Sequence, residues 1–159
     1  ELSKIKGIGL AKACRIISAL ELGRRVSVAS EMQKFKISSP QDIGNVYMEE
    51  LRYKKKEIFR VVLLNTKNVI IGSKDISEGS LNASIVHPRE VFLEAIKKSA
   101  NKMILMHNHP SGDSAPSNED INITHRIYEC GKIIGISVLD HIIIGKNNYC
   151  SLKERRIIN

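Results

Sequence analysis

Apolar residues recur at spacings of three and four along four stretches of the chain, the pattern of helices with one buried face. These stretches cover residues 10–22, 40–51, 88–100 and 117–134. Pro40 and Pro88 suit the first turn of a helix, because a backbone N–H would have no partner within the helix there. Gly23, followed by Arg24 and Arg25, is typical of a helix end.

Short apolar runs of strand length lie between the later helices. They cover residues 58–64, 69–71, 103–106 and 136–144, and residues 149–152 are expected to pair back after a turn. The polar stretch 72–84 contains two glycines and predicts loops or short strands. The alternation of helices and strands predicts an α/β domain with a mixed sheet covered by helices.

The composition along the chain suggests three parts. Residues 1–25 form a short helical segment, residues 26–39 mix serine and lysine and are expected to be a linker, and residues 40–159 form the main domain. One compact domain with a short appendage fits a length of 159 residues.

The charge balance is basic, since 25 Lys and Arg minus 17 Asp and Glu leave +8. Such a charge favours anionic partners such as nucleic acid, and it is also compatible with a basic protein that binds none. The longest apolar runs are four residues, too short to span a membrane, and the first residues lack the apolar stretch of a signal peptide. Three widely spaced cysteines without a CxxC pair predict buried, reduced thiols in a cytoplasmic protein.

The segment HNHPSGDSAPSNED, residues 107–120, carries the candidate chemistry. His107 and His109 are two positions apart, so on an extended chain both imidazoles point to the same side. Asp120, in the first turn of the next predicted helix, would supply a carboxylate as third ligand. Two histidines and one carboxylate leave the fourth position of a tetrahedral zinc ion open, which is the pattern of catalytic sites.

Other interpretations of this segment remain. Ser117 and Asp120 also have the spacing of a capping box, and capping is compatible with a metal-binding Asp120. The adjacent letters HNH do not make a nuclease of that name, whose residues are scattered along the chain. The zinc deaminase signature, His-x-Glu followed by Pro-Cys-x-x-Cys, is absent from the sequence.

The spacing His107-x-His109-x7-Ser117-x-x-Asp120 resembles the JAMM (JAB1/MPN) metalloprotease motif. Further blocks resemble the RadC family more closely: HNHPSGDSAPSNED itself, VHPREVF (86–92), LDHIIIG (139–145), IKGIGLAKA (5–13) and ALELGRR (19–25). The resemblance implies a JAB1/MPN fold, related in topology to cytidine deaminases, with a short helical N-terminal segment and one zinc ion.

The resemblance also implies a role for each site residue. His107, His109 and Asp120 would bind zinc, and Ser117 would hydrogen-bond the oxyanion of the tetrahedral intermediate. Glu57, just before the first core strand, would be the general acid and base. A carboxylate there can take a proton from water and return it to the leaving amine.

Several polar residues near these positions have alternatives. Glu49 and Glu50 lie one to two helical turns before Glu57 and compete with it for the role of base. Asn108 departs from the Ser or Thr usual in deubiquitinating relatives, which argues against ubiquitin-type substrates but not against the metal. Asp140 and His141 could support the metal ligands from behind, or His141 could be a satisfied core histidine.

The N-terminal residues resemble a helix-hairpin-helix that contacts DNA. Gly7 and Gly9 would let the backbone approach a phosphate at the start of a helix, and Lys6 and Lys12 would add charge. Residues 1–25 carry six Lys or Arg against two Glu. A GxG sequence before a helix also serves ordinary packing.

The leading function is a zinc-dependent hydrolase of the JAMM type that cleaves a peptide or isopeptide bond in a DNA-associated, RadC-like protein. Its substrate would be a peptide or protein, DNA a second partner through the N-terminal hairpin, and no membrane partner is expected. The alternative is a non-catalytic DNA-associated module with a structural or vestigial metal site. Phosphodiester hydrolysis is a third possibility, although many nucleases use two metals.

Overall fold

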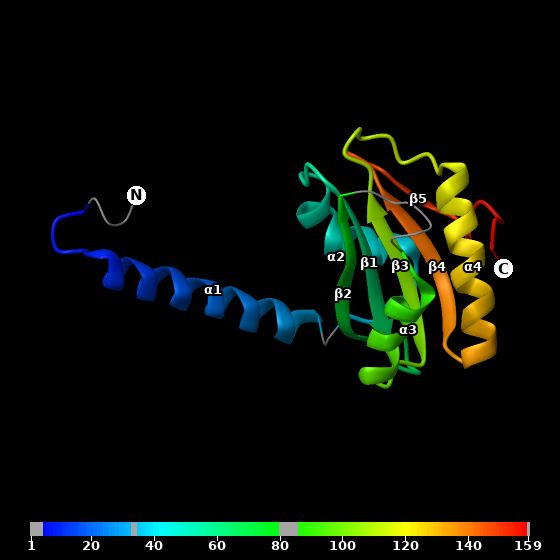
Figure 1. The fold of residues 1–159 in the computed structure, drawn as a ribbon, viewed down its shortest axis with the longest axis horizontal. Helices are drawn as coiled ribbons and strands as arrows, with labels where there is room; N and C mark the ends of the chain where they lie inside the picture. Colours follow the sequence, from blue (N-terminus) through cyan, green and yellow to red (C-terminus); the bar gives the residue numbers. More distant parts are fainter. Residues whose placement is uncertain (1–4, 33–34, 80–85, 159) are drawn as a thin grey trace. The chain divides into compact units, whose positions relative to one another are not determined.

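The computed structural model describes residues 5–32, 35–79 and 86–158, which form four helices and five strands. The chain divides into two compact units, Glu1–Lys34 and Phe35–Asn159 (Figure 1). The predicted boundaries at residues 25 and 39 stay a prediction, and each unit is described by itself.

The first unit is dominated by α1, Leu10–Met32. The helix end that we expected at Gly23 is wrong, because α1 continues nine residues past it and takes up residues 26–32 of the expected linker. Gly23 is not in the left-handed conformation of a helix cap. Glu21 also pairs with Arg24 and Arg25 at 2.8 Å, and pairs at these spacings support a continuing helix.

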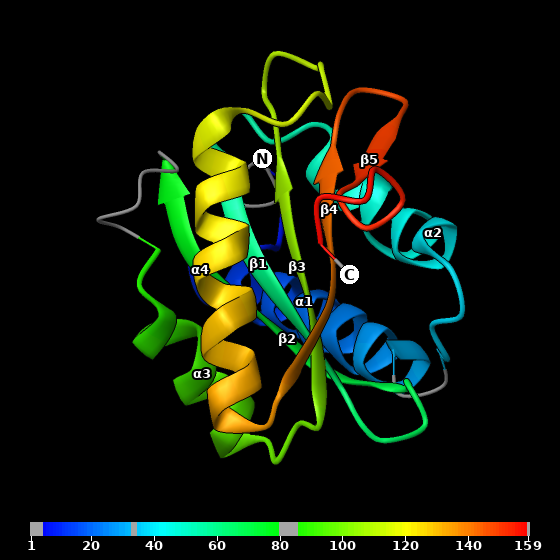
Figure 2. The same ribbon diagram turned by 90° about the vertical axis from the view of Figure 1, so that its right-hand side faces the viewer.

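The second unit contains a five-stranded sheet of order β2-β1-β3-β4-β5. β3 and β4 are parallel and the other neighbours are antiparallel. Helices α3 and α4 lie on one face and α2 on the other (Figure 2). The predicted α/β domain with a mixed sheet is therefore confirmed. Its elements are α2 (Pro40–Leu51), β1 (Glu57–Leu64), β2 (Ile70–Gly79), α3 (Pro88–Lys97), β3 (Lys102–Asn108), α4 (Asn118–Ile134), β4 (Ser137–Ile144) and β5 (Tyr149–Ser151).

Strand β2 is longer than its polar sequence indicates. It pairs with β1 from Leu64↔Ile70 to Glu57↔Gly79, with two irregularities in the register, where we expected loops or short strands. β2 is the outermost strand of the sheet, and beyond Ile70, whose N–H bonds the Phe35 carbonyl, only its β1 side is paired among the described residues. Polar and charged residues are the usual composition of such a strand. Residues 80–84 of the same stretch lie outside the described part.

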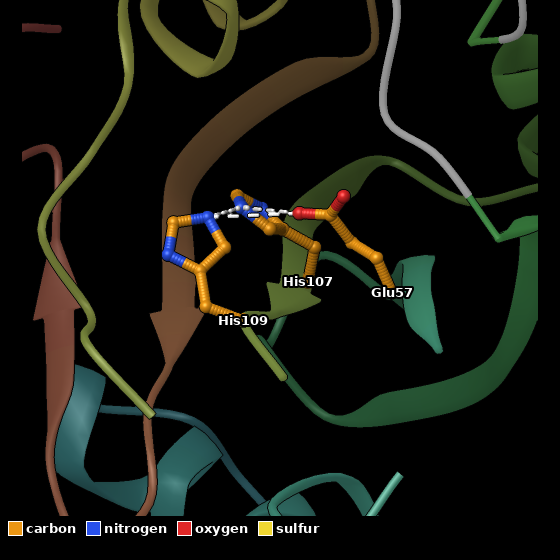
Figure 3. A group of neighbouring side chains, drawn as sticks. All are labelled: Glu57, His107 and His109. Carbon is orange, nitrogen blue, oxygen red and sulfur yellow. Dashed lines mark hydrogen bonds and ion pairs between the residues drawn. The ribbon is translucent and has the colours of Figure 1, made fainter. Parts of the chain in front are cut away.

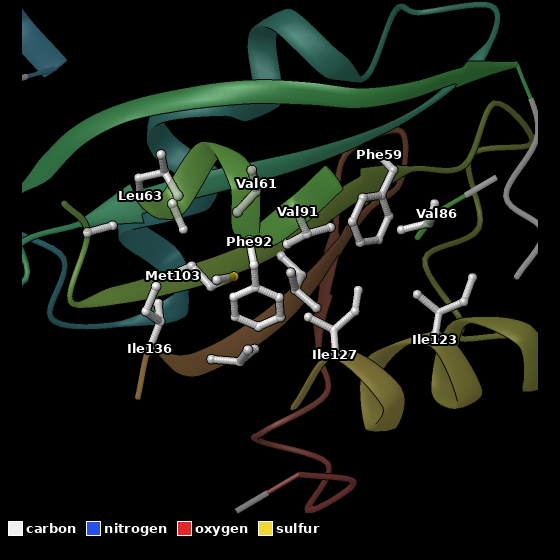
Figure 4. Packing of buried hydrophobic residues seen from close by; sticks show 14 residues of the cluster. Phe59, Val61, Leu63, Val86, Val91, Phe92, Met103, Ile123, Ile127 and Ile136 are labelled. Carbon is white, nitrogen blue, oxygen red and sulfur yellow. The ribbon is translucent and has the colours of Figure 1, made fainter. Parts of the chain in front are cut away.

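The main core lies between the sheet and helices α3 and α4 (Figure 4). Alternate residues of β1, Phe59, Val61 and Leu63, point into it and are completely buried. Phe92 of α3 and Ile127 of α4 meet them from the helical layer. The period of two along β1 thus determines which side chains face α4, where the candidate site begins.

On the opposite face, α2 packs over a buried arginine. The Arg60 guanidinium bonds both oxygens of Glu50 at 2.8 Å, bonds Asp75, and lies over the ring of Tyr47. This ion pair places Glu50 on the face of the sheet opposite the core of Figure 4.

Of the three free cysteines, Cys150 is buried, Cys130 is partly buried and Cys14 is exposed. The expectation that all three are buried is therefore wrong for Cys14, which lies on α1. Among the described residues, no helix combines the length and apolar character needed to cross a membrane.

Gly131 lets α4 approach the start of β4 closely. A Cβ at this position would lie 2.6 Å from the carbonyl oxygen of Ile136. We expect Gly131→Ala to lower the free energy of unfolding by about 1–3 kcal/mol, although alanine is the better helix former. Urea unfolding measures the change. Gly23→Ala, with nothing near its Cβ, is the control, and equal midpoints for both variants would contradict the argument.

Candidate metal centre

The sheet register brings Glu57 and the two histidines to one place. Phe59 of β1 pairs with His107 of β3, so the two side chains are on the same face of the sheet. Glu57 lies two residues before Phe59, and His109 lies two residues after His107, which keeps all of them on that face. Figure 3 shows the three side chains converging from β1 and from the end of β3.

Their ligand atoms are close enough to bind one metal ion. Nε2 of His107 is 3.0 Å from Nε2 of His109. Oε1 of Glu57 is 3.6 Å from His109 Nε2 and 3.9 Å from His107 Nε2. One ligand atom from each residue lies within 4.8 Å of the others. Glu57, His107 and His109 could therefore hold a metal ion.

Asp120 approaches the same point from the first turn of α4. Its carboxylate is almost completely buried, with Oδ1 3.2 Å from His107 Nε2 and Oδ2 3.5 Å from His109 Nε2. The structure thus brings together the three ligands that the sequence predicts, with Glu57 beside them. The choice of Asp120 as ligand and Glu57 as base stays a prediction.

Ser117 caps α4 and holds Asp120. Its hydroxyl accepts the Asp120 N–H at 3.2 Å and donates to Asp120 Oδ2 at 2.7 Å. The Ser117 N–H donates to the same oxygen at 2.7 Å. The capping box and the inward-facing carboxylate therefore occur together, and Oδ1 remains for the metal centre.

A backbone carbonyl determines which nitrogen of His109 carries the proton. His109 Nδ1 lies 2.7 Å from the carbonyl oxygen of Asp113, which can only accept a hydrogen bond. Nδ1 must therefore carry the hydrogen. In the neutral imidazole, Nε2 then has a lone pair directed at His107.

A chain of three side chains orients His107 in the same way. The Thr124 hydroxyl donates to the carbonyl of Asp120, so it must accept from Nδ1 of His141. Burial above all lowers the pKa of His141 well below its ordinary value, so the imidazole is neutral. Its Nε2 accepts from Nδ1 of His107 at 2.8 Å. Nε2 of His107 is therefore also a lone-pair atom.

Two lone pairs that face each other at 3.0 Å need a cation between them. On one tetrahedral metal ion, two imidazole nitrogens lie roughly 3.3 Å apart, given metal–nitrogen distances of about 2.0–2.1 Å. The separation in the structure is close to that value. The donor set, two imidazoles with carboxylates beside them, thus fits a metal ion.

Positive charge at this point keeps Asp120 ionised. Burial raises the pKa of Asp120, but the contact with His107, the positive charge of a cation at its Nε2 and the two bonds from Ser117 outweigh burial. The pKa is therefore held well below its usual range. The carboxylate needs no deprotonation before it binds a metal near neutral pH.

The remaining predicted residues lie elsewhere. Asp140 binds the Ser151 hydroxyl at 2.6 Å and the backbone N–H of Lys153 and His141, so it joins β4 to β5 and does not bond the His141 ring. Nδ1 of that ring bonds Thr124 instead, a residue that sequence reasoning missed. The available signal was its position four residues after Asp120, on the same face of the helix.

The other acidic candidates are engaged away from the site: Glu49 pairs with Arg52 at 2.6 Å, and Glu50 with Arg60.

The predicted DNA-contact residues lie in the first unit. Gly7 has a φ of 90°, in a turn closed by the Ile8 N–H and the Ile5 carbonyl, and Gly9 directly precedes α1. Lys12 Nζ bonds the Gly7 carbonyl at 3.1 Å. The turn expected around the two glycines is present, with Lys12 folded onto it.

Thr124→Val tests whether the chain behind His107 supports the metal. The change keeps the side-chain shape but leaves Nδ1–H of His141 without its acceptor. We expect metal affinity to fall by about tenfold or more, the usual effect of losing such support. Competition with a chromophoric chelator measures it. Thr66→Val, at the exposed turn after β1, is the control, and equal affinities for both variants would exclude the role.

Comparison with known proteins agrees with this arrangement. A family model described as RadC-like JAB domain matches residues 37–157. UPF0758 proteins of Alkaliphilus oremlandii and Alkaliphilus metalliredigens are 61% and 59% identical over 158 residues, which are 99% of this chain and 68% of theirs. A UPF0758 protein of Clostridium botulinum is 53% identical over 99% of this chain and 69% of its own length. The chain therefore belongs to the RadC family of JAB-domain proteins.

Proposed function

We propose that this chain is a zinc-dependent hydrolase of the JAMM type that cleaves a peptide or isopeptide bond. The proposal depends above all on one observation. Two imidazole lone pairs meet at 3.0 Å beside a buried carboxylate, and a second, partly exposed carboxylate borders the same point.

The choice of zinc follows from the donor types. Two nitrogen ligands and one carboxylate suit zinc, whereas magnesium and calcium prefer sites made of oxygen alone. Zinc held by His107, His109 and Asp120 would polarise the scissile carbonyl and lower the pKa of water to about 7.

We assign the proton transfer to Glu57. Its side chain is 22% exposed, whereas His107 is completely buried, so Glu57 borders both solvent and the metal centre. From there, its carboxylate takes a proton from the attacking water and delivers it to the leaving amine, which prevents the amine from leaving as an anion.

Ser117 can turn toward the substrate without releasing Asp120. Its hydroxyl and its backbone N–H both donate to Oδ2 of Asp120, each at 2.7 Å. If the hydroxyl rotates to donate to the oxyanion, the N–H still holds the carboxylate. We therefore assign oxyanion stabilisation to the Ser117 hydroxyl.

Glu57→Gln separates metal binding from catalysis. Zinc-loaded protein is incubated with a peptide library and with lysine-branched peptides, and new amino termini are counted by mass spectrometry. We expect the variant to bind about one zinc ion per chain and to lose about 100-fold or more of the cleavage rate. Glu129→Gln, on the outer face of α4, is the control.

Two results would contradict the proposal. An unchanged rate in Glu57→Gln would remove Glu57 from the mechanism. A zinc-loaded wild type that cleaves neither substrate class would favour the alternative, in which the metal site is structural or vestigial.

A second proposal concerns nucleic acid. The φ of 90° at Gly7 and the open space around Gly7 and Gly9 would let phosphates approach the start of α1, in keeping with the net charge of +8.

Duplex binding measured across salt concentrations tests this contact. We expect affinity to fall with salt, and Lys6→Glu to reduce the slope by about one, whereas Lys67→Glu in the turn after β1 changes it little. Salt-independent binding would contradict phosphate contact.

A further inference from the structure

Asn108 lies between the two histidines in sequence but faces away from them. It is 1% exposed, and its side chain contacts none of the metal-facing atoms among the described interactions. Because side chains alternate along β3, His107 points to the metal centre and Asn108 points elsewhere. A buried amide has several hydrogen-bonding groups to satisfy, so its partners indicate what it does.

Among the described residues, all partners of the Asn108 side chain belong to the backbone around Glu57. Oδ1 accepts the N–H of Ile58 at 2.9 Å. Nδ2 donates to the carbonyl of Lys56 at 3.2 Å and lies 3.5 Å from that of Lys54. The Lys56 carbonyl comes directly before Glu57 and the Ile58 N–H directly after it. One amide therefore holds the backbone on both sides of Glu57.

This amide continues the sheet where the backbone pairing stops. The register of β1 with β3 ends at the pair Phe59↔His107. Beyond it, β2 still pairs with Glu57 on one side, and the Asn108 side chain bonds the segment on the other. Lys54, Lys55 and Lys56 are exposed, so their side chains provide no apolar packing for this segment.

We propose that Asn108 is a positioning residue that sets the distance of the Glu57 carboxylate from the two histidine Nε2 atoms. Three consecutive residues, His107, Asn108 and His109, then carry both histidine ligands and the side chain that places the base. The inference rests on the proposed role of Glu57. It also explains why residue 108 is asparagine and not the Ser or Thr usual in deubiquitinating relatives. A hydroxyl is shorter and carries one proton, so it cannot reproduce the contacts of the amide.

Asn108→Asp is the sharpest variant, because it keeps the shape and the acceptor for Ile58 but places an acceptor against the Lys56 carbonyl. Asn65→Asp is a matched control, since Asn65 Oδ1 also accepts two backbone N–H groups, in the turn after β1. We expect amide exchange in residues 54–58 to accelerate by about tenfold or more only in Asn108→Asp. Asn108→Ser serves as a second variant if the aspartate prevents folding.

Cobalt(II) added to the metal-free protein reports whether the effect acts through Glu57. We expect Glu57→Gln and Asn108→Asp to shift the visible cobalt bands in the same direction. The cobalt bands of the double variant should match those of Glu57→Gln alone. Once residue 57 has no carboxylate, its position no longer affects the metal. A merely structural role of Asn108 would add a further change in the double variant.

Two outcomes overturn the inference while leaving the proposed hydrolase standing: wild-type bands in Asn108→Asp, or additive shifts in the double variant. Failure of the proposed function is seen separately, as a wild type that cleaves no peptide. If Glu57→Gln leaves the cobalt bands unchanged, Glu57 does not face the metal and the inference falls with it.

Discussion

Nε2 of His107 and Nε2 of His109 lie 3.0 Å apart, and the other nitrogen of each ring already donates its hydrogen elsewhere. Two acceptors in contact, one fully buried on His107 and one on the partly buried His109, repel each other and largely lack the hydrogen bonds that water would give them. The arrangement is stable only with a proton or a metal ion between the rings. The Asp113 carbonyl on one side and the chain His141–Thr124 on the other maintain this orientation.

The fold brings this contact about through the register of its sheet. Because β1 and β3 are antiparallel, the start of β1 and the end of β3 meet at the same end of the sheet. Helix α4 connects β3 to the parallel strand β4, and its first turn brings Asp120 to that end as well. Residues 50 positions apart thus become neighbours, as the bond between Ile58 and Asn108 illustrates. A one-residue slip between β1 and β3 would turn Glu57 to the opposite face.

The spacing of apolar residues was sufficient to predict the helices and strands that bury one face. Helical spacing predicted α2, α3 and α4, and the period of two at His107 and His109 predicted that both rings share a side. Glu57 came from the family resemblance alone, because no local spacing relates it to His107. The tertiary pairing of β1 with β3 supplies that relation.

The features that the sequence did not predict depend on contacts that form only in the folded chain. The long strand β2 has the polar sequence typical of a strand at the edge of a sheet. Helix α1 continues past Gly23, and ion pairs on its surface support it there. Thr124, on α4, was missed because its role depends on His141, which reaches it from strand β4. Asp140 was one candidate for support of the metal ligands from behind, but alternation along β4 points it to Ser151.

The central claim is that His107 and His109 share one metal ion with carboxylate oxygen completing the site. X-ray absorption at the zinc edge of the zinc-loaded wild-type protein tests this most directly. We expect nitrogen and oxygen ligands at about 2.0–2.1 Å from the zinc ion, with the outer-shell signature of two imidazoles. A shell containing sulfur at about 2.3 Å, or one without imidazole, would contradict it.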